Sequence, residues 1–287
     1  MIVIYTFDFK KNASEISKNE QYMMLVASIQ SVLDNNIIKP KICVYSGDSE
    51  FIKRIYQDFD DQITIVKNER KKYCDNDDFT CAGHARINAI LDFIDTDDVL
   101  YLDNDTLIQP DGLYILKTQY NLPSGYRKEE YNPLKKWIKI ISKSYKQYYC
   151  LLSMCQSWIN KSTINNGVQY YPRSYISKAL ALNIKHNYER LLKKCGYTYG
   201  LDQVVYTISL YEMNLDQLQI YNNGTTNTVW HAYCFKDQYI NNLKKIGLYS
   251  ETNINILKRK DVYDKLKLLN KQRIIFKYEQ KSQELIY

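Results

Sequence analysis

Hydrophobic and polar residues follow two different periods along the first 106 residues. Short runs of β-branched and aromatic residues predict buried strands at 2–7, 41–45, 63–66 and 99–102. Between these runs, apolar residues recur at helical spacing and predict helices at 19–34, 49–58 and about 80–93. Because strands and helices of these lengths alternate, the pattern predicts an α/β fold built on a doubly wound, mostly parallel sheet.

The pattern changes after residue 106. Residues 134–152 place apolar side chains on one face and lysines largely on the other, which predicts one amphipathic, basic helix. We interpret it as a helix packed through its apolar face, with docking to a membrane or an acceptor as the alternative. The other predicted elements are a strand at 163–171, helices near 174–193 and 202–212, a strand at 218–221 and a lysine-rich tail after 257.

The composition is that of a globular protein. Hydrophobic residues make up 45% of the 287, and only nine Gly and five Pro are present, which leaves little material for linkers. No apolar run approaches the roughly 20 residues that span a bilayer, and the first residues lack the pattern of a signal peptide. We therefore expect a soluble protein in the cytoplasm.

Cysteine spacing and net charge exclude few classes of function. The seven cysteines are widely spaced and include no Cys-x-x-Cys pair, so we expect reduced thiols in the core rather than disulfides or a zinc site. The net charge of +7 is compatible with a nucleotide phosphate, an anionic membrane surface or nucleic acid. Charge alone does not choose among these ligands.

Two carboxylates follow the predicted strand at 99–102. Asp103 and Asp105 lie where that strand ends, and ligands of doubly wound sheets bind outside the carboxyl ends of the strands. Hard divalent cations prefer oxygen ligands, and carboxylates two residues apart can converge on one ion that also holds a diphosphate. The alternative is a turn or a helix cap, which suits the acidic cluster at 95–98 better.

The segment Val-Leu-Tyr-Leu-Asp-Asn-Asp-Thr at 99–106 resembles the corresponding strand of the GT-A fold, D-x-D nucleotide-sugar glycosyltransferases. Within these it resembles glycosyltransferase family eight, which includes lipooligosaccharide galactosyltransferases and glycogenin. The resemblance implies a GT-A domain at 1–245, with a nucleotide-binding half at 1–106 and an acceptor and donor-sugar half at 107–245. Residues 246–287 would form a basic C-terminal extension.

The same resemblance implies roles for individual residues. The metal, Mn²⁺ or Mg²⁺, would be held by Asp103, Asp105 and His231. The catalytic face would be formed by Asp202 and Gln203. The donor would be bound by Thr6, Asp8, Arg86, Asp103, Asn104, Asn165, Gly167 and Lys236. The chain departs from the family pattern at Val204, at Cys234 and at Asp237-Gln238.

The implied activity is metal-dependent transfer of a hexose from UDP-glucose or UDP-galactose to a glycan, protein or lipid acceptor, with retention of configuration. An inverting enzyme would need a carboxylate base, and Asp202 could be that base. The alternatives are a sugar nucleotidyltransferase and a non-catalytic glycan- or nucleic-acid-binding module. Nucleotidyltransferases usually have a Gly-rich loop after the first strand, whereas residues 7–14 contain no Gly. We expect no nucleic-acid partner, and we treat a peripheral membrane contact as an additional hypothesis.

Overall fold

The structure is a computed structural model, and it describes residues 1–9, 14–35, 37–67, 80–108, 111–125, 128–216 and 228–231. Its helices are α1 (Glu15–Leu33), α2 (Ser49–Phe59), α3 (Thr80–Phe93), α4 (Gly112–Gln119), α5 (Leu134–Ile141), α6 (Tyr145–Met154), α7 (Tyr175–Cys195) and α8 (Leu201–Glu212). Its strands are β1 (Ile2–Thr6), β2 (Lys41–Ser46), β3 (Thr64–Lys67), β4 (Val99–Leu102), β5 (Thr106–Ile108), β6 (Ser124–Gly125), β7 (Lys128–Pro133), β8 (Ser162–Ile164), β9 (Val168–Tyr171) and β10 (Val229–His231).

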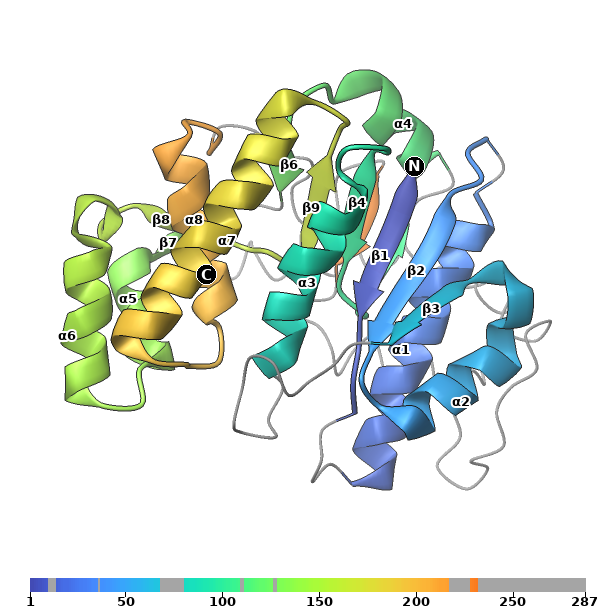
Figure 1. The fold of residues 1–287 in the computed structure, drawn as a ribbon, viewed down its shortest axis with the longest axis horizontal. Helices are drawn as coiled ribbons and strands as arrows, with labels where there is room; N and C mark the ends of the chain where they lie inside the picture. The colour runs from blue at the N-terminus through green and yellow to red at the C-terminus, as the bar shows by residue number, and fades with distance from the viewer. Residues whose placement is uncertain are drawn as a thin grey trace, which may run out of the picture.

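A six-stranded sheet in the order β3-β2-β1-β4-β9-β6 forms the centre of the molecule (Figure 1). The first four of these strands are parallel, and β9 runs antiparallel to both β4 and β6. This confirms the predicted α/β class with a mostly parallel sheet. The carboxyl ends of β1, β2 and β4 therefore lie at one edge, where such sheets bind their ligands.

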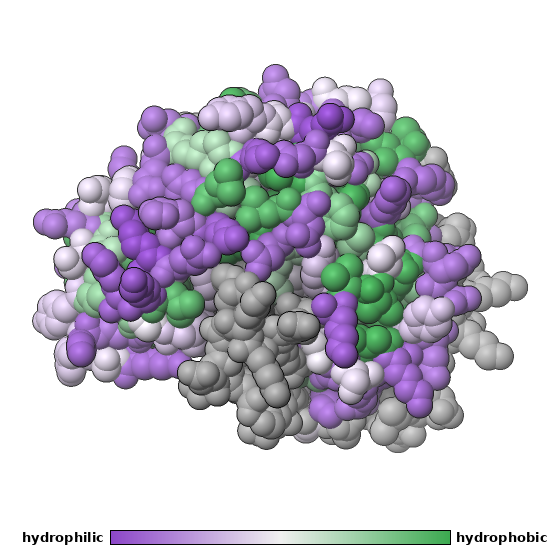
Figure 2. Space-filling view, in the orientation of Figure 1, coloured by the Kyte–Doolittle hydropathy of each residue, from purple (hydrophilic) through white to green (hydrophobic). Residues whose placement is uncertain are grey.

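Alternating side chains of β1 divide the core into two layers. Val3 and Tyr5 pack with α1 and α2 on one face of the sheet, and Ile2 and Ile4 pack with α3, α5, α7 and α8 on the other. Helices therefore cover both faces, as the doubly wound pattern requires (Figure 1). On the face shown in Figure 2, hydrophilic side chains cover most of the surface over α6 and α7.

A smaller two-stranded sheet brings a distant segment to the main one. β10 pairs antiparallel with β5, and His231 lies opposite Thr106 in that ladder. A residue late in the chain is thereby placed beside the Asp103–Asp105 turn between β4 and β5.

The predicted single helix at 134–152 is wrong, because two helices occupy this segment. α5 ends at Ile141, whose carbonyl accepts a hydrogen bond from Thr198 Oγ1. α6 begins after Ser144, whose Oγ accepts from the backbone N–H of Gln147, while Gln147 Oε1 accepts from the N–H of Lys143. Side chains thus satisfy the backbone groups at the break. The predicted strand at 163–171 is likewise two strands, β8 and β9.

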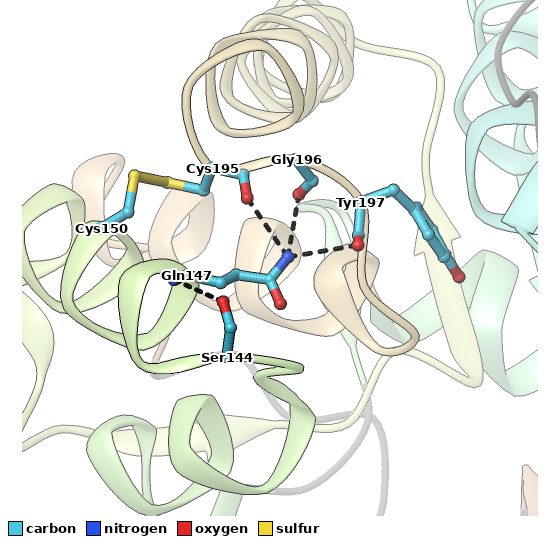
Figure 3. Close-up of a disulfide and its surroundings, with 6 residues drawn as sticks. All are labelled: Ser144, Gln147, Cys150, Cys195, Gly196 and Tyr197. Atoms are coloured by element: carbon cyan, nitrogen blue, oxygen red, sulfur yellow. Dashed lines mark hydrogen bonds between the residues drawn. A yellow bond between two sulfur atoms is a disulfide. The ribbon is translucent and has the colours of Figure 1, made fainter.

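The expectation of reduced cysteines is wrong for one pair. Cys150 on α6 and Cys195 at the end of α7 form a disulfide, with their Cα atoms 5.6 Å apart (Figure 3). The fold brings together two residues 45 positions apart, a proximity that no local spacing indicates. Cys43 and Cys155 are the buried free thiols of the described residues, and burial raises the pKa of Cys155 to about 12.

Three expectations fall outside the described residues: the strand at 218–221, the tail after 257 and the extension at 246–287. The division of the chain at residues 106 and 245 stays a prediction. Within the described ranges, no helix has both the length and the apolar composition that crossing a bilayer requires.

The disulfide gives a stability prediction. A bond that closes a loop of 45 residues is expected to contribute about 4 kcal/mol by restricting the unfolded chain. Dithiothreitol should therefore lower the melting temperature of the wild type, and thermal denaturation followed by circular dichroism measures the shift. The Cys150→Ala/Cys195→Ala double variant is the control, because its melting temperature should not respond to the reductant. An equal response in both proteins would contradict the prediction.

Candidate active site

The turn after β4 is fixed by hydrogen bonds from three directions. The N–H of Asp103 donates to the carbonyl of Gly167 at 2.7 Å, and Thr106 Oγ1 donates to the carbonyl of Asp103 at 2.8 Å. Ser28 of α1 lies 2.9 Å from both Thr106 Oγ1 and the hydroxyl of Tyr5. This polar network inside the core fixes the turn that carries both carboxylates.

Asp103, Asp105 and His231 converge at this turn. One ligand atom from each lies within 4.8 Å of the others, and His231 Nε2 is 3.1 Å from Asp105 Oδ1. Asp105 and His231 are buried, at 1% and 7% exposure, whereas Asp103 is partly open to solvent. Two carboxylates and one imidazole form a donor set that fits Mn²⁺ or Mg²⁺. The three residues assigned to the metal therefore come together.

Gly167 makes room for this cluster. A Cβ atom at this position would lie 2.7 Å from Asp103 Oδ2 and 2.9 Å from His231 Nε2, closer than packed atoms approach. The backbone of Gly167 is held in place because its N–H donates to Asn165 Oδ1 at 2.8 Å. Only a residue without a side chain leaves both ligand atoms accessible.

Arg86 joins the Asp103–Asp105–His231 group to α8. Its Nη2 is 3.1 Å from Asp103 Oδ1, and its Nη1 is 3.4 Å from Asp202 Oδ2. The guanidinium also donates to the carbonyl of Asn166 at 2.9 Å and lies 4.1 Å from the ring centroid of Tyr101. Arg86 is 8% exposed, so its ion pairs with Asp103 and Asp202 are not ordinary surface contacts.

Several charges set the protonation of Asp103. Burial raises the pKa of its carboxyl group, the neighbouring Arg86 lowers it, and the nearby Asp105 raises it again. The hydroxyl of Tyr101 donates to Asp103 Oδ1 at 2.9 Å, which favours the ionised form. The net pKa lies above the ordinary value for aspartate. A cation bound beside Asp103 would oppose this increase, because positive charge favours the carboxylate.

The first turn of α8 presents the two residues assigned to catalysis. Asp202 Oδ2 accepts a hydrogen bond from Asn166 Nδ2 at 2.7 Å in addition to its ion pair with Arg86. Gln203 is 5% exposed, and its Nε2 has no hydrogen-bond partner in the described part of the chain. A buried amide donor without a partner is uncommon, and it leaves Gln203 with an unused hydrogen bond for a ligand.

The other residues assigned to the donor lie at the same edge but bond mainly to the protein. Thr6 Oγ1 is 3.1 Å from the hydroxyl of Tyr101, and Asp8 Oδ1 accepts from Ser46 Oγ and from the N–H of Gly47, each at 2.8 Å. Asn104 Nδ2 donates to the carbonyl of Gln21 at 3.3 Å. Lys236 lies outside the described residues.

Tyr101 and Asn166 contact these residues but are not predicted from the sequence. Tyr101 could have been found, because it is on β4 two residues before Asp103, which directly follows that strand, and the extended backbone directs alternate side chains to the same face. Asn166 gave no such signal, since its contacts with Arg86 and Asp202 join segments that are far apart in the chain.

Comparison with known proteins identifies the fold. No protein-family model and no curated protein matches the chain. Among solved structures, a bifunctional glycosyltransferase, WbbM, matches 92% of this chain at 14% identity and a TM-score of 0.52, and the match spans 51% of WbbM. The fold is of the GT-A type.

Two further likenesses are weaker. The galactosyltransferase LgtC, in complex with donor and acceptor sugar analogs, covers 71% of this chain and 69% of its own at 14% identity and a TM-score of 0.45. A putative glucose-1-phosphate thymidylyltransferase from Bacillus anthracis covers 90% of this chain and 97% of its own at 13% identity and a TM-score of 0.45. The assignment of the GT-A fold rests on the first match, because these two scores fall below 0.5.

The position of Gly167 gives a prediction about metal binding by Asp103, Asp105 and His231. Gly167→Ala should abolish the binding of Mn²⁺, because the added methyl group collides with Asp103 and His231 at the end of the sheet. Isothermal titration with MnCl₂ measures the binding. Gly196→Ala is the control, since a Cβ there has no neighbour within 4 Å and adds only backbone strain at φ +74°. Unchanged Mn²⁺ affinity in Gly167→Ala would remove Gly167 from the site.

Proposed function

We propose that this chain is a metal-dependent glycosyltransferase that moves a hexose from UDP-glucose or UDP-galactose to a glycan, protein or lipid acceptor. The observation that supports this most is the convergence of Asp103, Asp105 and His231 at the carboxyl edge of a GT-A sheet. Nucleotide ligands of doubly wound sheets bind at this edge. The solved glycosyltransferase of similar fold supports the reaction class.

Mn²⁺ or Mg²⁺ would be held by the two carboxylates and the imidazole, and it supplies positive charge that stabilises a departing diphosphate. Arg86 would bind the donor. Its Nε is buried without a hydrogen-bond partner among the described residues, while its Nη atoms are fixed by Asp103, Asp202 and the carbonyl of Asn166. A guanidinium held this rigidly needs little reorganisation to contact a phosphate or a sugar hydroxyl.

Retention of configuration is the outcome that the contacts of α8 favour. Asp202 Oδ2 is engaged by both Arg86 and Asn166, so this oxygen anchors Arg86 and is poorly arranged to accept a proton from an acceptor hydroxyl. Inversion requires such a base on the face opposite the leaving group. Gln203 would then contribute its free amide as a hydrogen-bond donor to the donor sugar.

The location of the enzyme stays a prediction. The cytoplasm was expected from the sequence, but disulfides are rare in reducing compartments. The Cys150–Cys195 bond therefore does not support that expectation.

Replacing one metal ligand tests the proposal. UDP should stabilise the wild type only when Mn²⁺ is present, by about 2.7 kcal/mol at 100 times its dissociation constant. Asp105→Asn should lose this stabilisation together with the hydrolysis or transfer of UDP-hexoses. Thermal shift and release of UDP measure the two effects. Asp95→Asn is the control, because Asp95 pairs with Lys178 at the surface.

Two results would overturn the proposal. One is an Asp105→Asn variant that turns over UDP-sugars like the wild type. The other is a wild type that ignores UDP-sugars but forms them from UTP and a hexose 1-phosphate with release of diphosphate, since this product pattern belongs to a nucleotidyltransferase.

Lys236 gives a second prediction for the donor. If its ammonium group contacts the diphosphate, Lys236→Ala should weaken UDP binding at least about tenfold, the effect of losing one charged hydrogen bond. Its melting temperature without ligand should stay that of the wild type. Titration calorimetry with UDP and Mn²⁺ measures the affinity, and Lys39→Ala at an exposed position is the control. Equal affinities for the two variants would exclude Lys236 from the site.

A further inference from the structure

Charge is distributed very unevenly along this chain. Residues 131–188 contain nine Lys and Arg and no Asp or Glu, whereas residues 1–130 contain 15 basic and 22 acidic residues. Helices α5 and α6 belong to the basic segment and lie at one end of the long axis of the molecule, with α2 and β3 at the other end (Figure 1). Five of these nine basic residues are on α5, on α6 or between them, and so lie at this end: Lys135, Lys136, Lys139, Lys143 and Lys146.

The exposed side of α5 is basic. Lys135, Lys136, Lys139 and Ile140 are exposed, and Ile140 is 63% exposed. At about 100° per residue, these four positions fall within roughly 140° of the helix circumference. Leu134, Ile138 and Ile141 are on the opposite side and are buried in the core beside the sheet.

The exposed side of α6 adds aromatic residues. Tyr145 and Tyr149 are one turn apart and are 84% and 64% exposed, with the exposed Lys146 next to Tyr145. Leu151, on the inner side of α6, is buried in the same hydrophobic cluster as Leu134 of α5. Both helices therefore turn their exposed sides away from one core, and we name these two exposed sides the α5–α6 face.

The lysines of the α5–α6 face are available for a partner. Among the described residues, Lys135, Lys136, Lys139 and Lys146 form no ion pair, which fits a segment without acidic side chains. The face is also preformed, because the Cys150–Cys195 disulfide and the hydrogen bonds of Gln147 fix α6 to the end of α7 (Figure 3). Hydrophilic side chains dominate this end of the molecule in Figure 2.

We propose that the α5–α6 face docks on a bilayer that contains anionic phospholipid. Lysine side chains reach lipid phosphates from a helix that lies at the interface, and tyrosine and isoleucine enter the zone between headgroups and acyl chains. Single-stranded RNA would pair with the lysines and stack on the two tyrosines, but it offers no apolar partner to the exposed side chain of Ile140. This inference does not depend on the proposed activity, although docking would bring a lipid-linked acceptor close to the enzyme.

Vesicle binding tests the charge. The full-length protein should sediment with vesicles of phosphatidylcholine and phosphatidylglycerol and not with pure phosphatidylcholine, and salt should weaken the binding. Lys135→Glu/Lys136→Glu/Lys139→Glu should lower the partition coefficient at least about tenfold. The matched control is Lys39→Glu/Lys41→Glu/Lys53→Glu, which changes the same charge at exposed positions near β2 and α2. An equal loss in the control would show that net charge matters and the face does not.

A second variant tests the contribution of the two tyrosines to vesicle binding. Tyr145→Ser/Tyr149→Ser should lower vesicle binding about threefold or more, because less apolar surface enters the interface. Tyr56→Ser/Tyr114→Ser is the control, since these tyrosines are 57% and 47% exposed elsewhere. The absence of binding by the wild type would overturn the proposal. It would also be overturned if the Tyr145→Ser/Tyr149→Ser variant bound vesicles fully while single-stranded RNA bound through the same lysines.

The vesicle assay contains no UDP-sugar and no metal. A failure of the glycosyltransferase proposal therefore leaves its result unchanged, and circular dichroism of each variant shows that the fold is retained.

Discussion

The arrangement of the site depends on the two ion pairs made by the buried guanidinium of Arg86. The guanidinium lies between Asp103, which follows a strand of the parallel sheet, and Asp202, which begins a helix far along the chain. Without this cation two neighbouring carboxylates would be left uncompensated beside the core, and breaking a buried pair by removing one partner typically costs several kcal/mol. The same contact that stabilises the fold therefore sets the distance between the candidate metal ligands and α8.

A second constraint acts inside the core beneath the candidate metal ligands. Tyr5, Ser28 and Thr106 place hydroxyl groups where most neighbours are apolar, and each hydroxyl is within 2.9 Å of the next. Burying a hydroxyl without a hydrogen-bond partner lowers the stability of the fold. The network therefore forms only when β1, α1 and β5 are correctly placed relative to one another. The hydroxyl network therefore holds the Asp103–Asp105 turn in a single conformation.

Features that depend on neighbouring residues could be predicted from the sequence, whereas features that depend on contacts between distant residues could not. The strands and helices of residues 1–106 depend on local periodicity, and the carboxylates after β4 follow from that periodicity. His231 became a candidate only through a family resemblance, because the β5–β10 pairing that delivers it joins residues more than 100 positions apart. The break between α5 and α6 escaped prediction because Thr198, which bonds to Ile141, comes from another part of the chain.

The link between α7 and α8 has a mechanical consequence. Gln147 Nε2 donates to the carbonyls of Cys195, Gly196 and Tyr197 at 3.2–3.4 Å, and the Cys150–Cys195 disulfide fixes the same segment (Figure 3). Trp137 Nε1 of α5 donates to the carbonyl of Gly200. The outer helices α5 and α6 are thereby joined to the residues just before Asp202 by a covalent bond and several hydrogen bonds. A displacement of α5 and α6 would therefore move the first turn of α8 with them as one rigid body.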